Sequence, residues 1–161
     1  MGKAASSSSS LSARGLHLAV VASRYNPQIV DALVAAARSR WRARGGAPAQ
    51  LRVERVPGAF ELPLVAQRLA LSRRIDAVVA LGCVIRGDTA HFDYVAGECA
   101  RGLQRVMLDT GVPISFGVLT VDTLAQAWAR AGRNALNKGA EALETALAMV
   151  QVLRQIGVGR P

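Results

Sequence analysis

Short apolar runs alternate along this chain with segments in which apolar residues recur every three or four positions. The apolar runs predict strands at residues 16–22, 51–56, 76–84 and 113–119. The spaced apolar positions predict a helix after each strand, because this spacing places them on one helical face. The third run (DAVVALGCV) is almost continuously apolar, which is typical of a strand that is covered on both faces.

Residues with known capping preferences mark several predicted helix ends. Asn26 is a favourable helix N-cap, and Pro27 suits the first helical position. Thr123 stands three residues before a glutamine, which is the spacing of a capping box and predicts that a helix begins there. We expect residues 138–139 (KG) to interrupt the chain, so that the last long helix covers residues 140–156.

The resulting element order, β-α-β-α-β-α-β-α-α, predicts an α/β fold. Helical connections between parallel strands cover both faces of a sheet. We therefore predict a single-domain three-layer α/β/α sandwich with a four-stranded parallel, flavodoxin-like sheet. Residues 1–13 are expected to form a flexible serine-rich tail, and residues 14–161 to form the domain. Because such sheets bind ligands outside the carboxyl ends of their strands, the segments that follow each strand are the place to search for a site.

Composition fits one globular domain and excludes some classes of protein. The 161 residues are 51% hydrophobic and 19% charged, which favours a collapsed core over disorder. No apolar run reaches the roughly 18 residues that a membrane-spanning helix needs, and residues 1–12 lack the apolar stretch of a secretory signal. We therefore expect a cytoplasmic protein that does not bind membranes. Residues 1–6 match the formal myristoylation pattern, but a polar tail is the favoured interpretation.

The positive charge raises nucleic-acid binding as a hypothesis. The chain has 20 basic and 11 acidic residues, a net charge of +9. However, the arginines are scattered, and aromatic residues make up only 4% of the chain, too few for a platform that stacks on bases. A solvated arginine-rich surface is the better explanation, and its charge would also attract small phosphorylated substrates.

Cysteine and histidine are too few for a structural metal site. The chain has two cysteines, Cys83 and Cys99, and two histidines, His17 and His91. A structural zinc site needs about four such ligands, so we expect no bound metal. Cys83 and His91 could suggest a thiol nucleophile with its base. We disfavour this hypothesis, because a cysteine at the end of an apolar strand is usually buried and inert.

The third predicted strand leads into residues 82–91 (GCVIRGDTAH), the segment richest in candidate chemistry. A glycine-bearing turn before a helix can bind a phosphate through backbone N–H groups and the helix dipole, with the Thr89 hydroxyl as a further donor. An imidazole at His91 could accept or donate a proton at neutral pH. The alternative is a plain turn in which Asp88 caps the helix and His91 lies on the surface.

Three other segments carry weaker signals, each with a structural alternative. Glu61 follows the second strand and could bind the hydroxyls of a polyol or complement a helix dipole. Tyr25 follows the first strand and could stack on a flat heterocycle or simply pack at a helix start. Arg130 could clamp a phosphate through its forked donors, or be one of many surface arginines.

In combination, these segments closely resemble the lumazine synthase family. The resemblance rests on residues 56–63 (VPGAFELP), 81–95 (LGCVIRGDTAHFDYV), 116–120 (FGVLT) and 137–139 (NKG), which occur in the family's order. It extends over roughly residues 16–150. It implies condensation of 5-amino-6-(D-ribitylamino)uracil with 3,4-dihydroxy-2-butanone 4-phosphate to 6,7-dimethyl-8-ribityllumazine, with loss of phosphate and water. No cofactor, metal or organic, is implied.

The resemblance also implies roles for individual residues, carried over by position. His91 would transfer protons, and Arg130 would hold the phosphate from a neighbouring subunit. The residues that bind substrate would be Tyr25, Ala59, Phe60, Glu61, Cys83, Val84, Ile85, Asp88, Thr89, Phe116 and Arg130. Phe116 and Lys138 would also come from the neighbour, so the implied partner is a second copy of this chain.

Two departures from the family pattern bear on function and assembly. Tyr25 stands where many relatives have Phe or Trp, which should preserve stacking. Residues 133–136 (RNAL) replace a glycine-containing turn of relatives that form 60-subunit shells, and Leu136 adopts positive φ less readily than glycine. We therefore expect a homopentamer, with a 60-subunit shell as the alternative. A flavin-binding module without turnover and a nucleic-acid binder are the competing functions.

Overall fold

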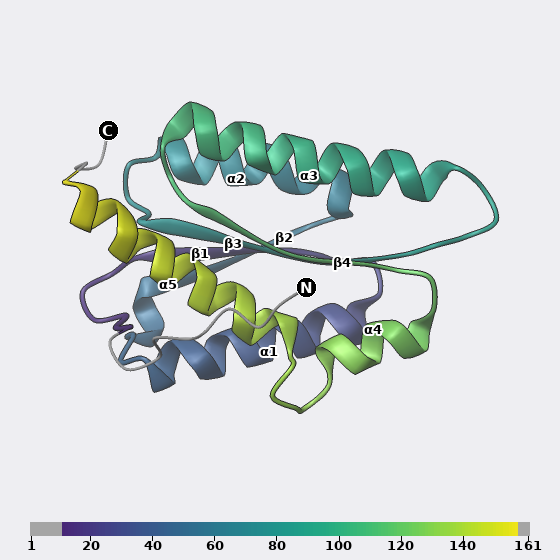
Figure 1. Cartoon of the computed structure of the whole chain (residues 1–161), viewed down its shortest axis with the longest axis horizontal. Helices are drawn as coiled ribbons and strands as arrows, with labels where there is room; N and C mark the ends of the chain where they lie inside the picture. Colours follow the sequence, from purple (N-terminus) through teal and green to yellow (C-terminus); the bar gives the residue numbers. More distant parts are fainter. Residues whose placement is uncertain (1–10, 158–161) are drawn as a thin grey trace.

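The computed structural model, which describes residues 11–157, contains each predicted strand and helix in the predicted order (Figure 1). The second strand has the predicted boundaries, and those of the other three strands differ from the predicted ones by one or two residues. The elements are β1 (Leu18–Ser23), α1 (Pro27–Ala43), β2 (Leu51–Val56), α2 (Leu62–Leu71), β3 (Ala77–Ile85), α3 (His91–Thr110), β4 (Ile114–Val121), α4 (Leu124–Ala131) and α5 (Lys138–Ile156). Two short 3-10 helices that the sequence did not predict, Pro48–Gln50 and Ala59–Glu61, precede β2 and α2.

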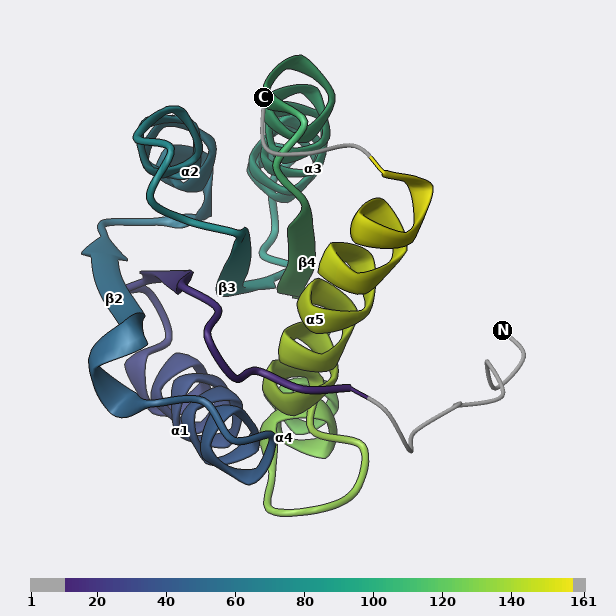
Figure 2. The ribbon, with the colours of Figure 1, turned by 90° about the vertical axis from the view of Figure 1, so that its left-hand side faces the viewer.

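The four strands form one parallel sheet with the order β2-β1-β3-β4. Helices α2 and α3 cover one face, while α1, α4 and α5 cover the other (Figures 1 and 2). The predicted three-layer sandwich is therefore confirmed. Among residues 11–157, no helix combines the length and the apolar character needed to cross a bilayer.

Apolar side chains from both faces of the sheet form two separate cores. In β1, Leu18, Val20 and Ala22 pack with α1 and α5, whereas Ala19 and Val21 pack with α2 and α3. All six residues of β1 are buried. Burial on both faces explains why the apolar runs lack the alternation of polar and apolar residues seen in half-exposed strands.

Asn26 occupies the N-cap position of α1, as predicted, but its side chain does not cap the helix. Its backbone is left-handed (φ 53°), a conformation that asparagine tolerates better than most residues. The side-chain Nδ2 instead donates a hydrogen bond of 2.9 Å to the carbonyl oxygen of Cys83 at the end of β3. The residue therefore joins two strand ends rather than closing a helix.

The predicted cap of α4 is present. Thr123 Oγ1 accepts a hydrogen bond of 3.1 Å from the N–H of Gln126. The reciprocal bond of the capping box is displaced by one residue, because Gln126 Oε1 accepts from the N–H of Asp122 at 2.8 Å. The cap thereby also fixes the chain where it leaves β4.

The prediction that Lys138 and Gly139 interrupt the chain before the last helix was wrong, because α5 begins at Lys138. Asn137 caps this helix, and its Oδ1 accepts from the N–H of Gly139 at 2.8 Å. A Cβ atom at Gly139 would lie 2.1 Å from the carbonyl oxygen of Leu33 in α1. The glycine is therefore needed for the close approach of two helices and does not mark a helix end.

The first described residues pack against the domain. Ala13 is fully buried, and its N–H donates a hydrogen bond of 2.9 Å to the carbonyl oxygen of Arg44. Residues 1–10, with the serine run and the myristoylation pattern, lie outside the described residues. The division into a tail ending at residue 13 and a domain from residue 14 stays a prediction.

The packing of α1 against α5 gives a test of stability. Gly139→Ala should lower the free energy of unfolding by about 1–3 kcal/mol, because the new methyl group must displace backbone of α1. The matched control is Gly97→Ala in α3, where the Cβ would meet only the flexible end of Arg101 and the helix gains up to about 1 kcal/mol of propensity. Urea unfolding curves measure both variants. Equal stability of the two would contradict the close approach.

Candidate functional site

The carboxyl ends of β1 and β3 lie at the point where the order of the strands in the sheet reverses. The chain passes from β1 outward to β2 and then returns to β3 on the other side of β1. Ligands of open α/β sheets bind in the crevice at such a point. The N–H of Arg24 donates to the carbonyl oxygen of Val56 at 2.9 Å, and Asn26 Nδ2 donates to that of Cys83. These two bonds connect the ends of β1, β2 and β3 at this end of the sheet.

An aromatic ring and a carboxylate lie next to each other at these strand ends. The Tyr25 side chain is exposed, and its ring lies against Gly58, since a Cβ at Gly58 would be 3.2 Å from ring atom Cδ2. Glu61 Oε2 accepts a hydrogen bond of 2.8 Å from the N–H of Gly58. The same glycine thus contacts both side chains that the sequence singled out after β1 and β2. The pair offers a flat apolar surface beside an acceptor for hydroxyl groups.

The turn after β2 contributes two further predicted residues. Ala59–Glu61 form a single 3-10 turn that leads directly into α2. Ala59 is buried against the core, whereas Phe60 is 57% exposed. The turn therefore fixes its backbone through Ala59 and presents Phe60 outward.

Cys83 is unsuited to act as a nucleophile. Its side chain lies in the core between the sheet and α1. Burial raises the pKa of its thiol to about 11, so the thiol stays protonated at neutral pH. Val84 and Ile85 complete the end of β3 and are half-buried. The end of β3 thus contributes apolar side chains and the carbonyl oxygen of Cys83, which accepts the hydrogen bond from Asn26.

The turn after β3 protrudes from the sheet, and all of its residues from Arg86 to Ala90 are exposed (Figure 1). His91 is the first residue of α3, and its N–H donates to Thr89 Oγ1 at 3.3 Å. Ala90 occupies the N-cap position, and no side chain caps the helix, so the alternative in which Asp88 acts as the cap was wrong. His91 is exposed in the single chain. The turn therefore presents backbone, hydroxyl and imidazole groups to whatever covers it.

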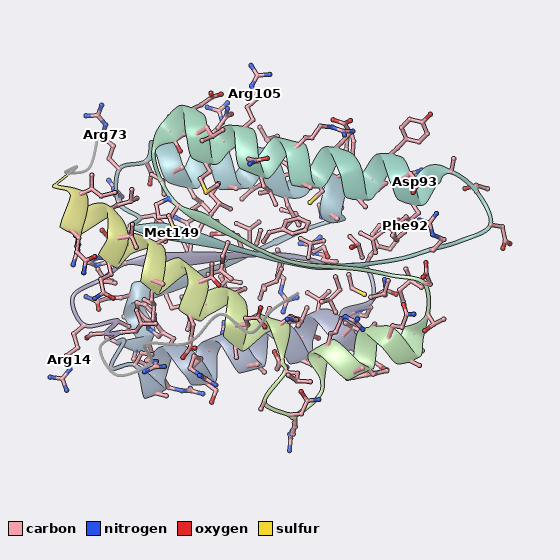
Figure 3. The ribbon with its side chains drawn as sticks, viewed as in Figure 1. Arg14, Arg73, Phe92, Asp93, Arg105 and Met149 are labelled. Carbon is pink, nitrogen blue, oxygen red and sulfur yellow. The ribbon has the colours of Figure 1, made fainter. Side chains whose placement is uncertain are left out.

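Arg86 is a residue of this region that sequence reasoning missed. Its Nη2 lies 3.1 Å from Asp93 Oδ1, and its Nε lies 3.2 Å from Asp122 Oδ1. The guanidinium also lies 4.2 Å from the centroid of the Phe92 ring. Hydrogen bonds to Asp93 and Asp122 raise the pKa of Arg86 above its ordinary value. Figure 3 shows Phe92 and Asp93 at the start of α3, beside the protruding turn.

Phe116, Arg130 and Lys138 come together in a different place. They line a hollow of about 390 Å³ between the edge strand β4 and helices α4 and α5. Arg130 Nη1 donates to the carbonyl oxygen of Gln126 at 3.0 Å, and Lys138 Nζ lies 2.6 Å from Glu141 Oε2. The hollow is lined by neither Tyr25 nor His91. One chain therefore carries two separate groups of predicted site residues.

Other parts of the described chain offer less chemistry. Among residues 11–157, no three His, Cys, Asp or Glu side chains are grouped so that they could hold a metal ion. A hollow of about 690 Å³ between α1 and α4 is lined mostly by small residues and by Trp128. It contains none of the predicted site residues. The end of the sheet at β1 and β3, with the turns that follow these strands, and the hollow beside β4 are thus the candidate functional surfaces.

Comparisons with known proteins show which family the chain belongs to. The sequence model of the 6,7-dimethyl-8-ribityllumazine synthase family matches residues 15–154. A protein of that name from Thermus thermophilus is 52% identical over 91% of this chain and 93% of its own length. Those from Syntrophus aciditrophicus and Halorhodospira halophila are 51% and 53% identical, over 91% and 86% of this chain and 95% and 88% of their own lengths. The chain belongs to the 6,7-dimethyl-8-ribityllumazine synthase family.

Proposed function

We propose that this protein is a cytoplasmic lumazine synthase of riboflavin biosynthesis. It would condense 5-amino-6-(D-ribitylamino)uracil with 3,4-dihydroxy-2-butanone 4-phosphate to give 6,7-dimethyl-8-ribityllumazine, phosphate and water. One observation carries the proposal beyond family membership. The exposed Tyr25 ring and the Glu61 carboxylate both lie against Gly58, at the carboxyl ends of the strands where the strand order reverses.

This arrangement suits the uracil substrate. The flat pyrimidinedione ring would stack on Tyr25 and pack against the end of β3 at Cys83, Val84 and Ile85. The ribityl chain would extend along the turn at Ala59–Glu61, where Glu61 accepts hydrogen bonds from its hydroxyls. A stacked ring and an anchored chain together would fix the orientation of the reacting amine.

The turn before α3 suits the phosphorylated substrate. Asp88 and Thr89 would bind the phosphate together with backbone N–H groups near the start of α3, where the helix dipole favours negative charge. His91 would then lie between the phosphate and the amine. It would shuttle protons as the Schiff base forms and as phosphate leaves.

A second copy of the chain would complete the site. Within one chain, Phe116, Arg130 and Lys138 line a hollow that is lined by neither Tyr25 nor His91. The resemblance nevertheless assigns both groups of residues to the same reaction. We therefore propose that Arg130 of one subunit holds the phosphate bound at the turn of its neighbour. The Arg130 fork suits a phosphate, and its only hydrogen bond within residues 11–157 is to a backbone oxygen. A homopentamer built from such shared sites remains our favoured assembly.

The proposal is tested by supplying both substrates to purified protein and following the absorbance of the lumazine product. A flavin-binding module would bind the product or riboflavin without forming it. A nucleic-acid binder would instead show salt-dependent binding of short duplexes at physiological salt. Absence of product with correctly folded protein would refute the synthase.

The two histidines provide a matched pair of variants. His91→Ala should lower kcat by about 100-fold or more, because positioned proton transfer contributes roughly that much, and should change the binding of the uracil less. His17 is exposed and immediately precedes β1, at the opposite end of the sheet. His17→Ala should therefore leave steady-state kinetics unchanged. Unchanged turnover in His91→Ala would remove this residue from the mechanism.

Arg130→Ala should mainly raise the KM of the phosphorylated butanone, by about 10-fold or more for a lost charge-assisted phosphate contact. The KM of the uracil should change little. Arg14→Ala, at the far end of the molecule in Figure 3, controls for the loss of one positive charge. Titrating each substrate at saturation of the other separates the two KM values. An effect confined to the uracil would contradict the assignment of Arg130.

A site shared between subunits predicts recovery of activity on mixing. Equal amounts of chains with His91→Ala and chains with Arg130→Ala are assembled together. If each site combines His91 of one chain with Arg130 of the next, about a quarter of the sites should contain both wild-type residues. The rates are compared at butanone phosphate concentrations well below the KM of Arg130→Ala. Each variant assembled with itself is the control. Mixed oligomers that show no recovery would place both residues in one chain's site.

A further inference from the structure

The polar contacts that link the turn before His91 to the end of β4 are made by Arg86. The four residues from Gly87 to Ala90 are exposed. The hydroxyl of Thr89 accepts from the N–H of His91, a bond that lies within the turn and does not reach the sheet. The N–H of Asp93 donates to the carbonyl oxygen of Ala90 at 3.0 Å, which again is local. These bonds lie within the turn and do not reach the sheet, whereas α3 itself packs on the sheet further along, through Val95, Cys99 and Leu103.

Arg86 supplies the missing connections. Its N–H donates to the carbonyl oxygen of Val121 at 2.9 Å, which fixes the start of the turn to β4. Its side chain reaches across to the first turn of α3, where it contacts Phe92 and Asp93. The same guanidinium contacts Asp122 at the end of β4. One residue thus ties the first turn of α3, which includes His91, to the ends of β3 and β4.

We propose that Arg86 is a positioning residue, which holds His91 and the turn at residues 87–90 in place through Asp93, Asp122 and Phe92. This inference rests on the proposed function. Three of the five guanidinium N–H groups of Arg86 are directed to carboxylates in the structure. Its Nε is directed to Asp122, and Nη1 and Nη2 face the two carboxylate oxygens of Asp93 at 3.5 and 3.1 Å. One face of the guanidinium is occupied by Phe92.

The pairing also balances charge where a phosphate is proposed to bind. Asp93 and Asp122 would otherwise place two unpaired carboxylates near an incoming phosphate, in addition to Asp88 in the turn itself. Arg86 neutralises part of this negative charge. Two consequences can be separated by substitution, because lysine preserves the charge but lacks the fork and the planar face that stacks on Phe92.

Arg86→Ala should lower kcat by about 10- to 100-fold, since small displacements of a catalytic group are costly. It should also raise the KM of the phosphorylated butanone and leave the KM of the uracil within about 2-fold. Arg86→Lys should restore the butanone KM while kcat stays low. The control is Arg105→Ala, which removes a similar exposed pair with Asp109 from the same helix. Arg105 points away from the sheet (Figure 3), and its loss should change neither parameter.

A mutant cycle distinguishes positioning from direct contact with substrate. If Arg86 acts through the two carboxylates, the double variant Asp93→Ala and Asp122→Ala should lose kcat as Arg86→Ala does. Adding Arg86→Ala to that double variant should then cause little further loss. If Arg86 instead binds the phosphate itself, the double variant frees the guanidinium and should keep its kcat near that of the wild type, because His91 would then not depend on the two carboxylates. That result would overturn the inference.

Hydrogen exchange provides a measurement that does not depend on turnover. In Arg86→Ala, amides of residues 87–93 should exchange faster, while those of β1 and α5 should not change. Unchanged exchange in the turn, or unchanged kcat in Arg86→Ala with an active wild type, overturns the inference alone. A wild-type protein that forms no lumazine refutes the proposed function, and with it the catalytic part of the inference.

Discussion

The hydrogen bond from Asn26 Nδ2 to the carbonyl oxygen of Cys83 connects the residues that follow β1 with the end of β3. The strand order of the sheet reverses between these two strands. Parallel strands bring their carboxyl ends to one end of the sheet, where β1 pairs with β2 as far as Ser23 and with β3 as far as Ala22. The bonds of Asn26 and of the Arg24 N–H extend these connections beyond the last paired residues. The residues that follow these strands are therefore positioned by backbone contacts at the strand ends.

These connected strand ends contrast with the exposed turn before α3. Tyr25 and Glu61 rest on Gly58, whose backbone is held at the end of β2. The polar contacts that link the turn at residues 87–90 to the end of β4 are instead made by one exposed side chain and its backbone, those of Arg86. In the proposed reaction, the flat substrate would meet a preformed surface. The phosphorylated substrate would meet a turn whose position depends on ion pairs and on a neighbouring chain.

Local patterns predicted the elements and the sheet but not the contacts between distant residues. The apolar runs identified all four strands, because burial on both faces leaves a continuous signal. The same reasoning misread Asn26 and Gly139, since the partners that explain them, Cys83 and Leu33, lie far away in sequence. Arg86 carried no local signal either, because Asp122 reaches it only through the pairing of β3 with β4. The family motifs did identify which residues to follow, but not how the fold supports them.

Exposed aromatic side chains connect the proposed chemistry with the proposed assembly. Tyr25 and Phe60, which follow β1 and β2, are 72% and 57% exposed, and Phe116 is 48% exposed on the edge strand β4. Leaving several aromatic side chains in water forgoes the free energy that their burial would contribute. A bound ring would cover Tyr25, and a neighbouring chain would cover Phe116. If one chain supplies Tyr25 and Phe60 and the next supplies Phe116 and Arg130, assembly and substrate binding bury parts of the same surface. Each would then stabilise the other, so substrate should strengthen the contact between subunits.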